Sequence, residues 1–220
     1  MPPYIYLVSG VFYKNLEIIN KMVTKIKLNN INNAEKGYLI GLFVGDGYLY
    51  HDRWRHYKIN FYLNSKKDKD IAKFAINLLN RIGLSPYIMH HKGCLIIRIN
   101  SKKLFLYIQK KADKIFLEKK DFLIGFISGL IDSDGYVAKG DIVISNIDKH
   151  LLEKIHNFCI ELGIYSKIWK QKITCRCNDS IIWRLRISTN FKYEKHYSQK
   201  ISRIYAGTAI HHSEHISKFG

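Results

Sequence analysis

Two aspartates at equivalent places in a repeated segment are the residues best suited to carry out chemistry in this chain. Asp46 lies near the end of segment 37–47, and Asp134, 88 residues later, holds the same place in segment 125–135. Each segment is an apolar run with a small residue at every fourth position and a glycine after the aspartate. Residues four apart share one face of an α-helix, so each segment predicts a helix that a second helix can approach closely. If the two stripes pack together, both carboxylates lie side by side at one rim.

Such a pair of carboxylates predicts a metal site. A single aspartate at a helix end is usually a cap or a solvated charge, but two at C-terminal helix ends face the negative end of each macrodipole and also repel each other. A divalent cation removes both costs. Oxygen ligands suit Mg²⁺ or Mn²⁺, and the carbonyls of Gly45 and Ser133 are candidate further ligands. Asp132 lies about 200° around the helix from Asp134 and is expected to point away from the metal.

The charge of the chain predicts a polyanionic partner. Its 220 residues include 36 Lys and Arg against 18 Asp and Glu, which gives a net charge of +18. This excess favours nucleic acid over the alternative of a merely basic enzyme, and fifteen tyrosines suit contacts with sugars and bases. Beside a DNA backbone, the metal site would support phosphodiester hydrolysis, in which the metal activates water and stabilises the leaving 3′ oxygen.

The remaining composition indicates a soluble protein inside a cell or organelle, with the compartment left open. Four cysteines, at positions 94, 159, 175 and 177, form no C-x-x-C pair and have no histidine at zinc spacing, so we expect reduced thiols. The longest apolar runs are too short to cross a bilayer, and the start lacks the features of a secretory signal. No membrane partner is expected.

The segments between and after the two aspartates predict an α+β fold with internal symmetry. Polar and apolar residues alternate over 58–64 and again over 95–100, which predicts half-buried strands, and helical periodicity covers 68–82. The second half repeats the order, so we expect two pseudo-symmetric α-β-β-α-β-β-α units that form paired antiparallel sheets around the two packed helices. The predicted divisions are an extension at 1–36, the two units at 37–120 and 121–205, and a tail at 206–220.

The sheet faces without helices form a predicted DNA-binding saddle, because a two-stranded ribbon fits the major groove. The offset between the repeats indicates eight extra residues in the first hairpin of the first unit and eight in the second hairpin of the second, which predicts an asymmetric target. The candidate DNA contacts are Arg53, Arg55, Lys58, Asn60, Tyr62, Lys66, Arg98, Asn146, Lys170, Lys172, Arg176, Arg184 and Arg186.

Segments 39–47 and 127–135 resemble the two motifs of a single-chain LAGLIDADG homing endonuclease, and the likeness extends over about residues 37 to 205 through motif spacing and element order. The resemblance implies a pseudo-two-fold monomer that binds a long asymmetric site in double-stranded DNA. It also implies metal-dependent cleavage of both strands with 3′ overhangs. The family's metal ligands match Asp46 and Asp134 together with the preceding carbonyls of Gly45 and Ser133.

The resemblance also implies helper residues around the metal. A basic residue before the second motif helix matches Lys120, with Lys119 as an alternative, and its partner in the second unit would be Lys200 or Arg203. The positions that often hold a water-organising Gln or Asn match Lys66 and Asn146, where Lys66 departs from the usual residue.

Three functions remain open at this point. The first is a site-specific DNA endonuclease, which the resemblance implies is encoded in a mobile intron. The second is an RNA-binding splicing maturase of the same fold, which would need neither acidic residue. The third is a transcription regulator, for which a helix-turn-helix would be expected and is not found in the sequence. The target sequence and the host intron stay undetermined.

Overall fold

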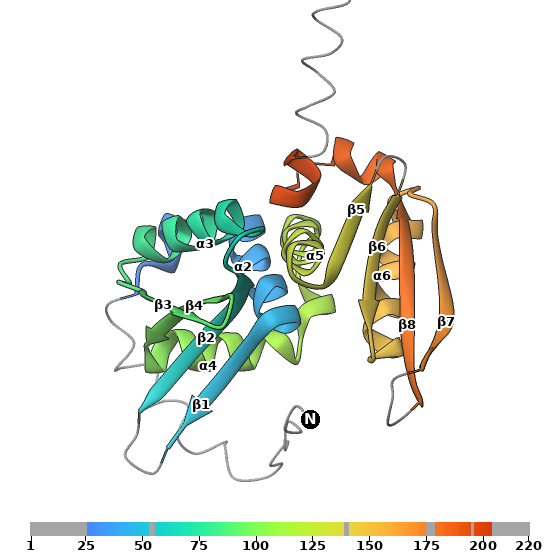
Figure 1. Cartoon of the computed structure of the whole chain (residues 1–220). Helices are drawn as coiled ribbons and strands as arrows, with labels where there is room; N and C mark the ends of the chain where they lie inside the picture. Colours follow the sequence, from blue (N-terminus) through green and yellow to red (C-terminus); the bar gives the residue numbers. More distant parts are fainter. Residues whose placement is uncertain (1–25, 53–55, 139–140, 175–178, 195, 204–220) are drawn as a thin grey trace, which may run out of the picture.

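The computed structural model describes residues 26–52, 56–138, 141–174, 179–194 and 196–203. It forms two successive units of the same design (Figure 1). The first contains α2 (Asn33–Asp46), β1 (Gly47–His51), β2 (Tyr57–Asn64), α3 (Lys69–Arg81), β3 (Tyr87–His91), β4 (Cys94–Asn100) and α4 (Lys102–Ala112). The second contains α5 (Lys120–Asp134), β5 (Gly135–Ala138), β6 (Asp141–Asn146), α6 (Lys149–Glu161), β7 (Ser166–Thr174), β8 (Asp179–Ser188) and a helical stretch at 199–203. Short 3₁₀ turns occur at Leu28–Asn30, Ile115–Leu117 and Thr189–Tyr193.

Each unit contributes one four-stranded antiparallel sheet, and the two sheets have matching topology. The strand orders are β1-β2-β4-β3 and β5-β6-β8-β7. Figure 1 shows the two sheets on opposite sides of the α2–α5 pair. One face of each central strand is buried in the core, through residues such as Ile59, Phe61 and Ile97 in the first unit and Ile144 and Leu185 in the second. The predicted α+β fold with two pseudo-symmetric units is therefore confirmed.

Helix α2 begins at Asn33, before segment 37–47 from which the helix was predicted. Asn32 accepts a hydrogen bond from the amide of Glu35, and the Glu35 carboxylate accepts one from the amide of Asn32. This capping box satisfies two of the amides left without partners at a helix N-terminus, so the helix begins at Asn33. The same Glu35 carboxylate binds Arg81 at the end of α3, which fixes the start of α2 against its own unit.

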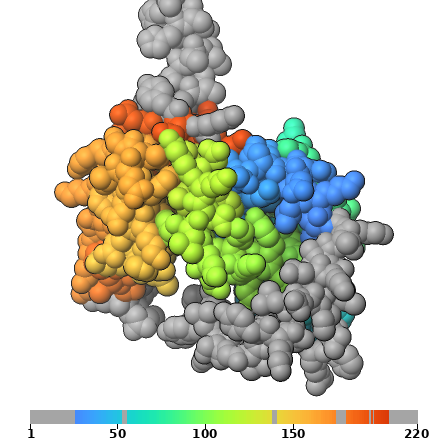
Figure 2. All heavy atoms as spheres, turned by 180° about the vertical axis from the view of Figure 1, so that it is seen from behind, coloured from blue at the N-terminus to red at the C-terminus, as the bar shows by residue number. Residues whose placement is uncertain are grey.

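The glycine stripes of α2 and α5 pack directly against each other. A Cβ atom added to Gly41 would lie 1.9 Å from the carbonyl oxygen of Phe126, and one added to Gly129 would lie 2.1 Å from that of Tyr38. Gly37 and Gly125 face backbone carbonyls equally closely. Backbone therefore meets backbone, as the four-residue spacing predicts. In the view from behind, residues of α2 and α5 lie next to each other in the middle of the molecule (Figure 2).

The hairpins of the two units differ in length, as expected. The first hairpin spans 47–64 in one unit and only 135–146 in the other, whereas the second spans 87–100 against 166–188. The two sheets therefore present ribbons of unequal reach. Cys94 and Cys159 carry free thiols. Within the described part of the chain, no helix is long and apolar enough to cross a membrane.

Candidate active site and nucleic-acid interface

Asp46 and Asp134 are the last residues of the two crossing helices, and a glycine that begins a strand follows each of them. The two helices stay in close contact up to the ends that carry the two aspartates. A Cβ atom added to Gly45 would lie 1.9 Å from Oγ of Ser133 and 3.2 Å from Cγ of Asp134. The helices therefore place the two carboxylates together, as the repeated glycines predict.

The environment of this pair disfavours negative charge. Burial first, and then the charge of Asp134, raise the pKa of Asp46 to about 6, whereas the charge of Lys200 opposes the shift. Burial also raises the pKa of Asp134, against a hydrogen bond from Asn146 and the charge of Lys200. A partly buried pair of carboxylates with raised pKa values is typical of a functional site, and a cation would relieve the repulsion.

The donors at this rim fit a hard divalent cation. In the described part of the chain, no group of three or more His, Cys, Asp or Glu side chains could enclose a metal. A cation at this end of the helices would have the adjacent carboxylates of Asp46 and Asp134 as side-chain ligands, with carbonyls, water and phosphate to complete the coordination. Mg²⁺ commonly binds in this way, through one or two carboxylates while it keeps several waters.

Lys200 is the basic residue beside the pair. Its Nζ donates hydrogen bonds to the carbonyl oxygens of Gly135, at 2.8 Å, and Ser133, at 3.3 Å. These two carbonyls flank Asp134, so the lysine fixes the backbone around the carboxylate. The Ser133 carbonyl, a predicted metal ligand, is therefore already a hydrogen-bond acceptor for Lys200.

The structure does not bring Lys120 to the aspartate pair. Lys120 is the first residue of α5 and Asp134 is the last, so the helix rise of 1.5 Å per residue separates them by about 20 Å. The Lys120 amine instead lies 3.3 Å from Glu194. Lys119, the N-cap of the same helix, is equally remote. Arg203 forms an ion pair with Asp70. Of the basic helpers considered, Lys200 is the one that reaches the site.

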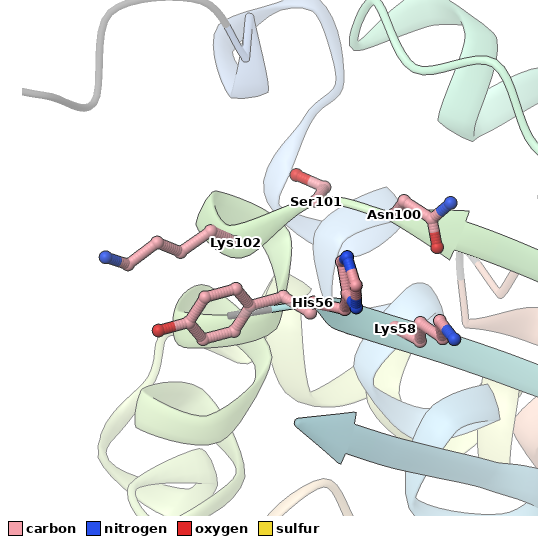
Figure 3. A pocket seen from close by; sticks show the side chains of 6 residues that line it. His56, Lys58, Asn100, Ser101 and Lys102 are labelled. Atoms are coloured by element: carbon pink, nitrogen blue, oxygen red, sulfur yellow. The ribbon is translucent and has the colours of Figure 1, made fainter. Parts of the chain in front are cut away.

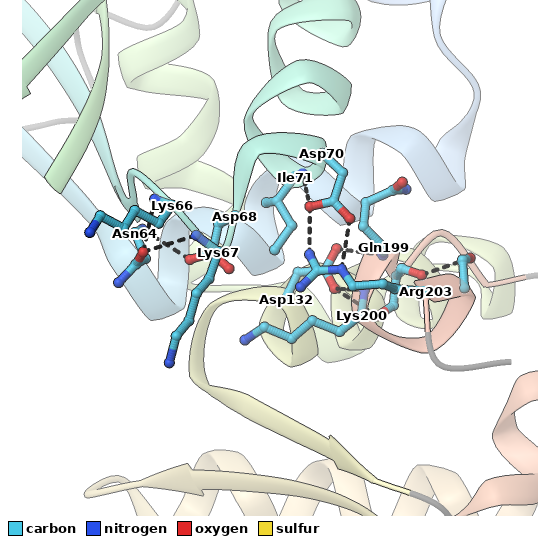
Figure 4. A network of polar contacts seen from close by, with 12 residues as sticks. Asn64, Lys66, Lys67, Asp68, Asp70, Ile71, Asp132, Gln199, Lys200 and Arg203 are labelled. Carbon is cyan, nitrogen blue, oxygen red and sulfur yellow. Dashed lines mark hydrogen bonds and ion pairs between the residues drawn. The ribbon is translucent and has the colours of Figure 1, made fainter. Parts of the chain in front are cut away.

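Asn146 contacts the pair, whereas Lys66 occupies a turn. Nδ2 of Asn146 donates to Oδ2 of Asp134 at 3.0 Å, and its Oδ1 accepts from the amide of Asp148 at 2.9 Å. In the first unit the same turn geometry belongs to Asn64, whose Oδ1 accepts from the amide of Lys66 at 3.0 Å (Figure 4). By local geometry, Asn64 is thus the counterpart of Asn146.

The predicted DNA contacts of the first sheet share its open face. In β2, Lys58, Asn60 and Tyr62 alternate with the core residues Ile59, Phe61 and Leu63, but Asn60 is itself only 4% exposed and so supports its neighbours on this face. Arg98 is directly opposite Asn60 on β4. Arg98 donates from Nε to Oδ1 of Asn60 at 2.9 Å, and Nδ2 of Asn60 donates to the Tyr62 hydroxyl at 3.2 Å. These bonds hold three polar side chains in a fixed array. The pairing also places three exposed tyrosines on this face, which are Tyr48, Tyr50 and Tyr87.

A basic pocket extends this face to the outer end of the first sheet (Figure 3). Its volume is about 320 Å³, and its lining residues are His56, Tyr57, Lys58, Asn100, Ser101 and Lys102. Three of the six side chains are basic. Arg53 and Arg55, which were predicted to contact DNA in the same hairpin, lie outside the described residues, as does Arg176 in the second unit.

The second sheet separates the predicted contacts into two groups. Arg184 and Arg186 of β8 alternate with the buried Leu185 and therefore share the open face. Their direct partners on β7 are Trp169 and Lys167, which sequence reasoning missed. Directly opposite residues of paired strands share a face.

Lys170 and Lys172 have the opposite orientation. Lys170 pairs with Trp183, which packs against the core, and Lys172 pairs with Ile181. Both lysines therefore share the face that carries Leu185, not the face of the two arginines. Arg186 is itself held 2.5 Å from Asp141 on β6.

Comparisons with known proteins agree with this architecture. A family model of the LAGLIDADG-like domain matches the chain twice, over residues 33–112 and 121–200. Homing endonuclease I-DmoI of Desulfurococcus mucosus is 30% identical over 154 residues, which cover 64% of this chain and 77% of that protein. The uncharacterized protein MJ0398 of Methanocaldococcus jannaschii is 28% identical over 156 residues, and the match spans 68% of this chain and 56% of that protein.

Solved structures show the same fold. A crystal structure of I-DmoI in complex with DNA and Mn superposes with a TM-score of 0.60 and 24% identity, over 73% of this chain and 93% of that one. Full-length DUF199/WhiA from Thermatoga maritima superposes with a TM-score of 0.54 and 17% identity, over 86% and 66% of the respective chains. At this level of identity the likeness concerns the fold.

Proposed function

This chain belongs to the LAGLIDADG family, and from that premise we propose that it is a site-specific endonuclease that cuts both strands of DNA at a long asymmetric site. The observation that carries the proposal is the pair of Asp46 and Asp134 at the ends of the crossing helices, with raised pKa values. A protein that only binds nucleic acid, such as a splicing maturase, has no need of this pair. The likeness to I-DmoI, named as a homing endonuclease, supports the same reading.

In this proposal the chain's own residues prepare the site for a divalent cation, Mg²⁺ or Mn²⁺. Asp46 and Asp134 hold the cation, Asn146 orients the Asp134 carboxylate, and Lys200 fixes the carbonyls on either side of it. When bound, the cation supplies an activated water and stabilises the leaving 3′ oxygen. Carbonyls of Gly45 and Ser133 are proposed to contribute further oxygen ligands.

The open faces of the two sheets are proposed to bind the duplex. In the first unit Tyr62 and Arg98, which the buried Asn60 holds in place, offer polar atoms to base edges and phosphates, with Lys58 and the basic pocket beyond them. In the second unit the longer ribbon offers Lys167 and Arg184. One chain contains both halves, so we propose that a monomer reads two different half-sites. We further propose that the cut leaves 3′ overhangs and that the gene is carried by a mobile intron.

Cleavage of a randomised duplex library tests the proposal. With Mg²⁺ the native protein should linearise a defined subset of sequences, and Asp134→Asn should reduce the rate at the selected site by more than about 100-fold, because even residues that only orient metal ligands contribute 10- to 100-fold. DNA binding should survive. Asp113→Asn, which makes the same change at an exposed position, is the control and should cut normally.

The outcomes are distinct. Selection of a site that both Asp46→Asn and Asp134→Asn still cut at the native rate would refute the metal assignment. Specific binding of a structured RNA without any cleavage of duplex DNA would favour a maturase instead.

A further inference from the structure

The C-terminal strap, which we define as residues 196–203, crosses from the second unit to the first. In the view from behind, the red residues at this end of the described chain run along the top of the molecule beside both units (Figure 2). The Tyr197 hydroxyl accepts a hydrogen bond from Nδ2 of Asn32 at 3.0 Å, and its ring stacks on Phe74 with centroids 6.1 Å apart. Arg203 binds both carboxylate oxygens of Asp70, at 2.5 and 3.0 Å. The strap is therefore attached to the first unit at both ends.

The middle of the strap is attached to Asp132, a buried carboxylate of α5 that is 1% exposed. Oδ1 of Asp132 accepts from Oγ of Ser198 at 2.7 Å and from the amide of Lys200 at 3.0 Å, and Oδ2 accepts from the amide of Gln199 at 2.8 Å (Figure 4). The carboxylate thus lies at the N-terminus of the helical stretch 199–203, where amides without helical partners and the macrodipole favour negative charge. A fourth bond, from the Tyr38 hydroxyl at 2.8 Å, comes from α2.

Lys200 connects this anchor to the aspartate pair. Its backbone amide is bound to Asp132, while its Nζ reaches the carbonyls of Ser133 and Gly135 on either side of Asp134. Lys200 is therefore held at its backbone and at its side-chain end by the last turn of α5 and the first residue of β5. Loss of the backbone anchor would loosen the middle of the strap and, with it, the amine beside the site.

Packing of the two helices alone does not account for a carboxylate at this position. The repeat places Val44 of α2 where α5 has Asp132, 88 residues later, and the apolar Val44 packs partly buried against the core. Burial of a carboxylate is unfavourable unless hydrogen bonds compensate, and three of the four compensating donors of Asp132 belong to the strap. The presence of a carboxylate at position 132 is thus explained by the strap, whose donors bind α5 at this position.

We propose that Asp132 is a positioning residue for DNA cleavage, which acts by anchoring the strap so that Lys200 stays beside Asp134. The inference rests on the proposed endonuclease function. It differs from a purely structural role for Asp132 in one respect, because its effect on cleavage requires Lys200 to be present.

A double-mutant cycle separates the two roles, since residues that act through one another have non-additive effects. The variants are Asp132→Asn, Lys200→Met and the double variant, tested by single-turnover cleavage of saturating target duplex in Mg²⁺. Asp132→Asn should slow cleavage by about 10- to 100-fold, as for residues that orient a metal site, with duplex affinity within about 2-fold of native. In the Lys200→Met background the same change should slow cleavage no further. Multiplicative losses would overturn the proposal.

A second measurement requires no cleavage. Acylation of lysine amines, mapped by mass spectrometry on the metal-free and DNA-free protein, should label Lys200 faster in Asp132→Asn than in the native chain, with the exposed Lys73 of α3 as internal reference. Unchanged labelling of Lys200 would overturn the proposal. If Asp132→Asn does not fold, Ser198→Ala removes a single bond to the same carboxylate and should change labelling and rate in the same directions.

Failure of the inference and failure of the proposed function remain distinguishable. If the native protein cuts no duplex in the library, the endonuclease proposal fails, while the labelling still tests whether Asp132 positions Lys200. If the native protein cuts and the cycle is additive, the positioning role alone is refuted.

Discussion

Replacement of Asp46 by Asn is expected to stabilise the metal-free protein at neutral pH, although it removes a proposed metal ligand. Asp46 is held in a site that raises its pKa from 3.8 to about 6, first by burial and then by the charge of Asp134. Between these two pH values the native state binds more protons than the unfolded state, so stability falls as the pH rises through this range. The full free-energy cost of the charged carboxylate is present only well above pH 6.

The size of the effect follows from the same shift. A rise in pKa from 3.8 to about 6 corresponds to at most about 3 kcal/mol, since each tenfold change in proton affinity is worth about 1.4 kcal/mol. Asn has no charge to bury. The difference in unfolding free energy between Asp46→Asn and the native chain should therefore be near zero at pH 4 and grow to at most about 3 kcal/mol at pH 8.

Urea denaturation at a series of pH values, with a chelator present, measures this difference. Asp113→Asn is the matched control, because it removes an exposed carboxylate and should show no such rise. Addition of Mg²⁺ should stabilise the native protein more than Asp46→Asn, because only the native pair is complete. An Asp46→Asn protein no more stable than the native chain at pH 8 without metal would refute the account of the site.

Two further predictions concern the helix crossing and the DNA face. Gly41→Ala should destabilise the fold by about 3 kcal/mol and lower Tm by roughly 6 to 12 °C in a thermal melt, because its Cβ would lie 1.9 Å from the Phe126 carbonyl oxygen; Gly93→Ala, with open space but a φ of +80°, should cost only about 1 kcal/mol. Lys167→Ala should reduce the slope of log affinity against log salt by about 0.9 in DNA-binding titrations, whereas Lys170→Ala on the other face should leave it unchanged, and equal effects would contradict the assignment of faces.

The helix crossing and its aspartates are predictable from the sequence because they depend on local spacing. Gly37, Gly41 and Gly45 recur at the period of one helix face, and the same spacing 88 residues later identifies the partner. A stripe without side chains admits few alternatives to close helix packing. The helical phase that turns Asp132 away from Asp134 follows equally from the geometry of one helix.

The faces of β7 and β8 were harder to predict because they depend on how two strands align. Lys170 and Arg184 each fall on an alternating pattern, but the patterns share a face only in one register. The structure pairs Arg184 with Trp169, so Lys170 belongs to the other face. A shift of one residue in strand register exchanges the two faces, and the sequence of a long hairpin does not determine that shift.

The counterpart of Asn146 was misplaced for a related reason. Alignment of the units at α3 and α6 matches Asn146 to Lys66, since both helices keep an offset of 80 residues. The extra residues of the first unit are divided between its hairpin and the turn before α3, which begins at Asn64. The offset of 80 residues measured on the helices therefore does not hold in the turn before them. In that turn, the hydrogen bonds of the amide side chain identify the equivalent residue.

The strap could not be predicted from the sequence. Ser198 and Lys200 lie 66 and 68 positions after Asp132 in the sequence and meet it through single hydrogen bonds that leave no periodic pattern. Lys200 is one of the candidate basic helpers, but the contacts that place it beside Asp134 are formed only in the folded chain.

The backbone contact at the α2–α5 crossing has a consequence for recombination between relatives. Because glycines of each helix contact backbone carbonyl oxygens of the other, the packing of the two units at the crossing depends little on which side chains they carry. Halves exchanged between relatives that keep these glycines should still assemble with their carboxylates adjacent. The strap sets the limit on such chimaeras, since Tyr197 and Arg203 of one half require Phe74 and Asp70 of the other. A chimaera that keeps the crossing but not these partners would assemble and still lack a fixed Lys200.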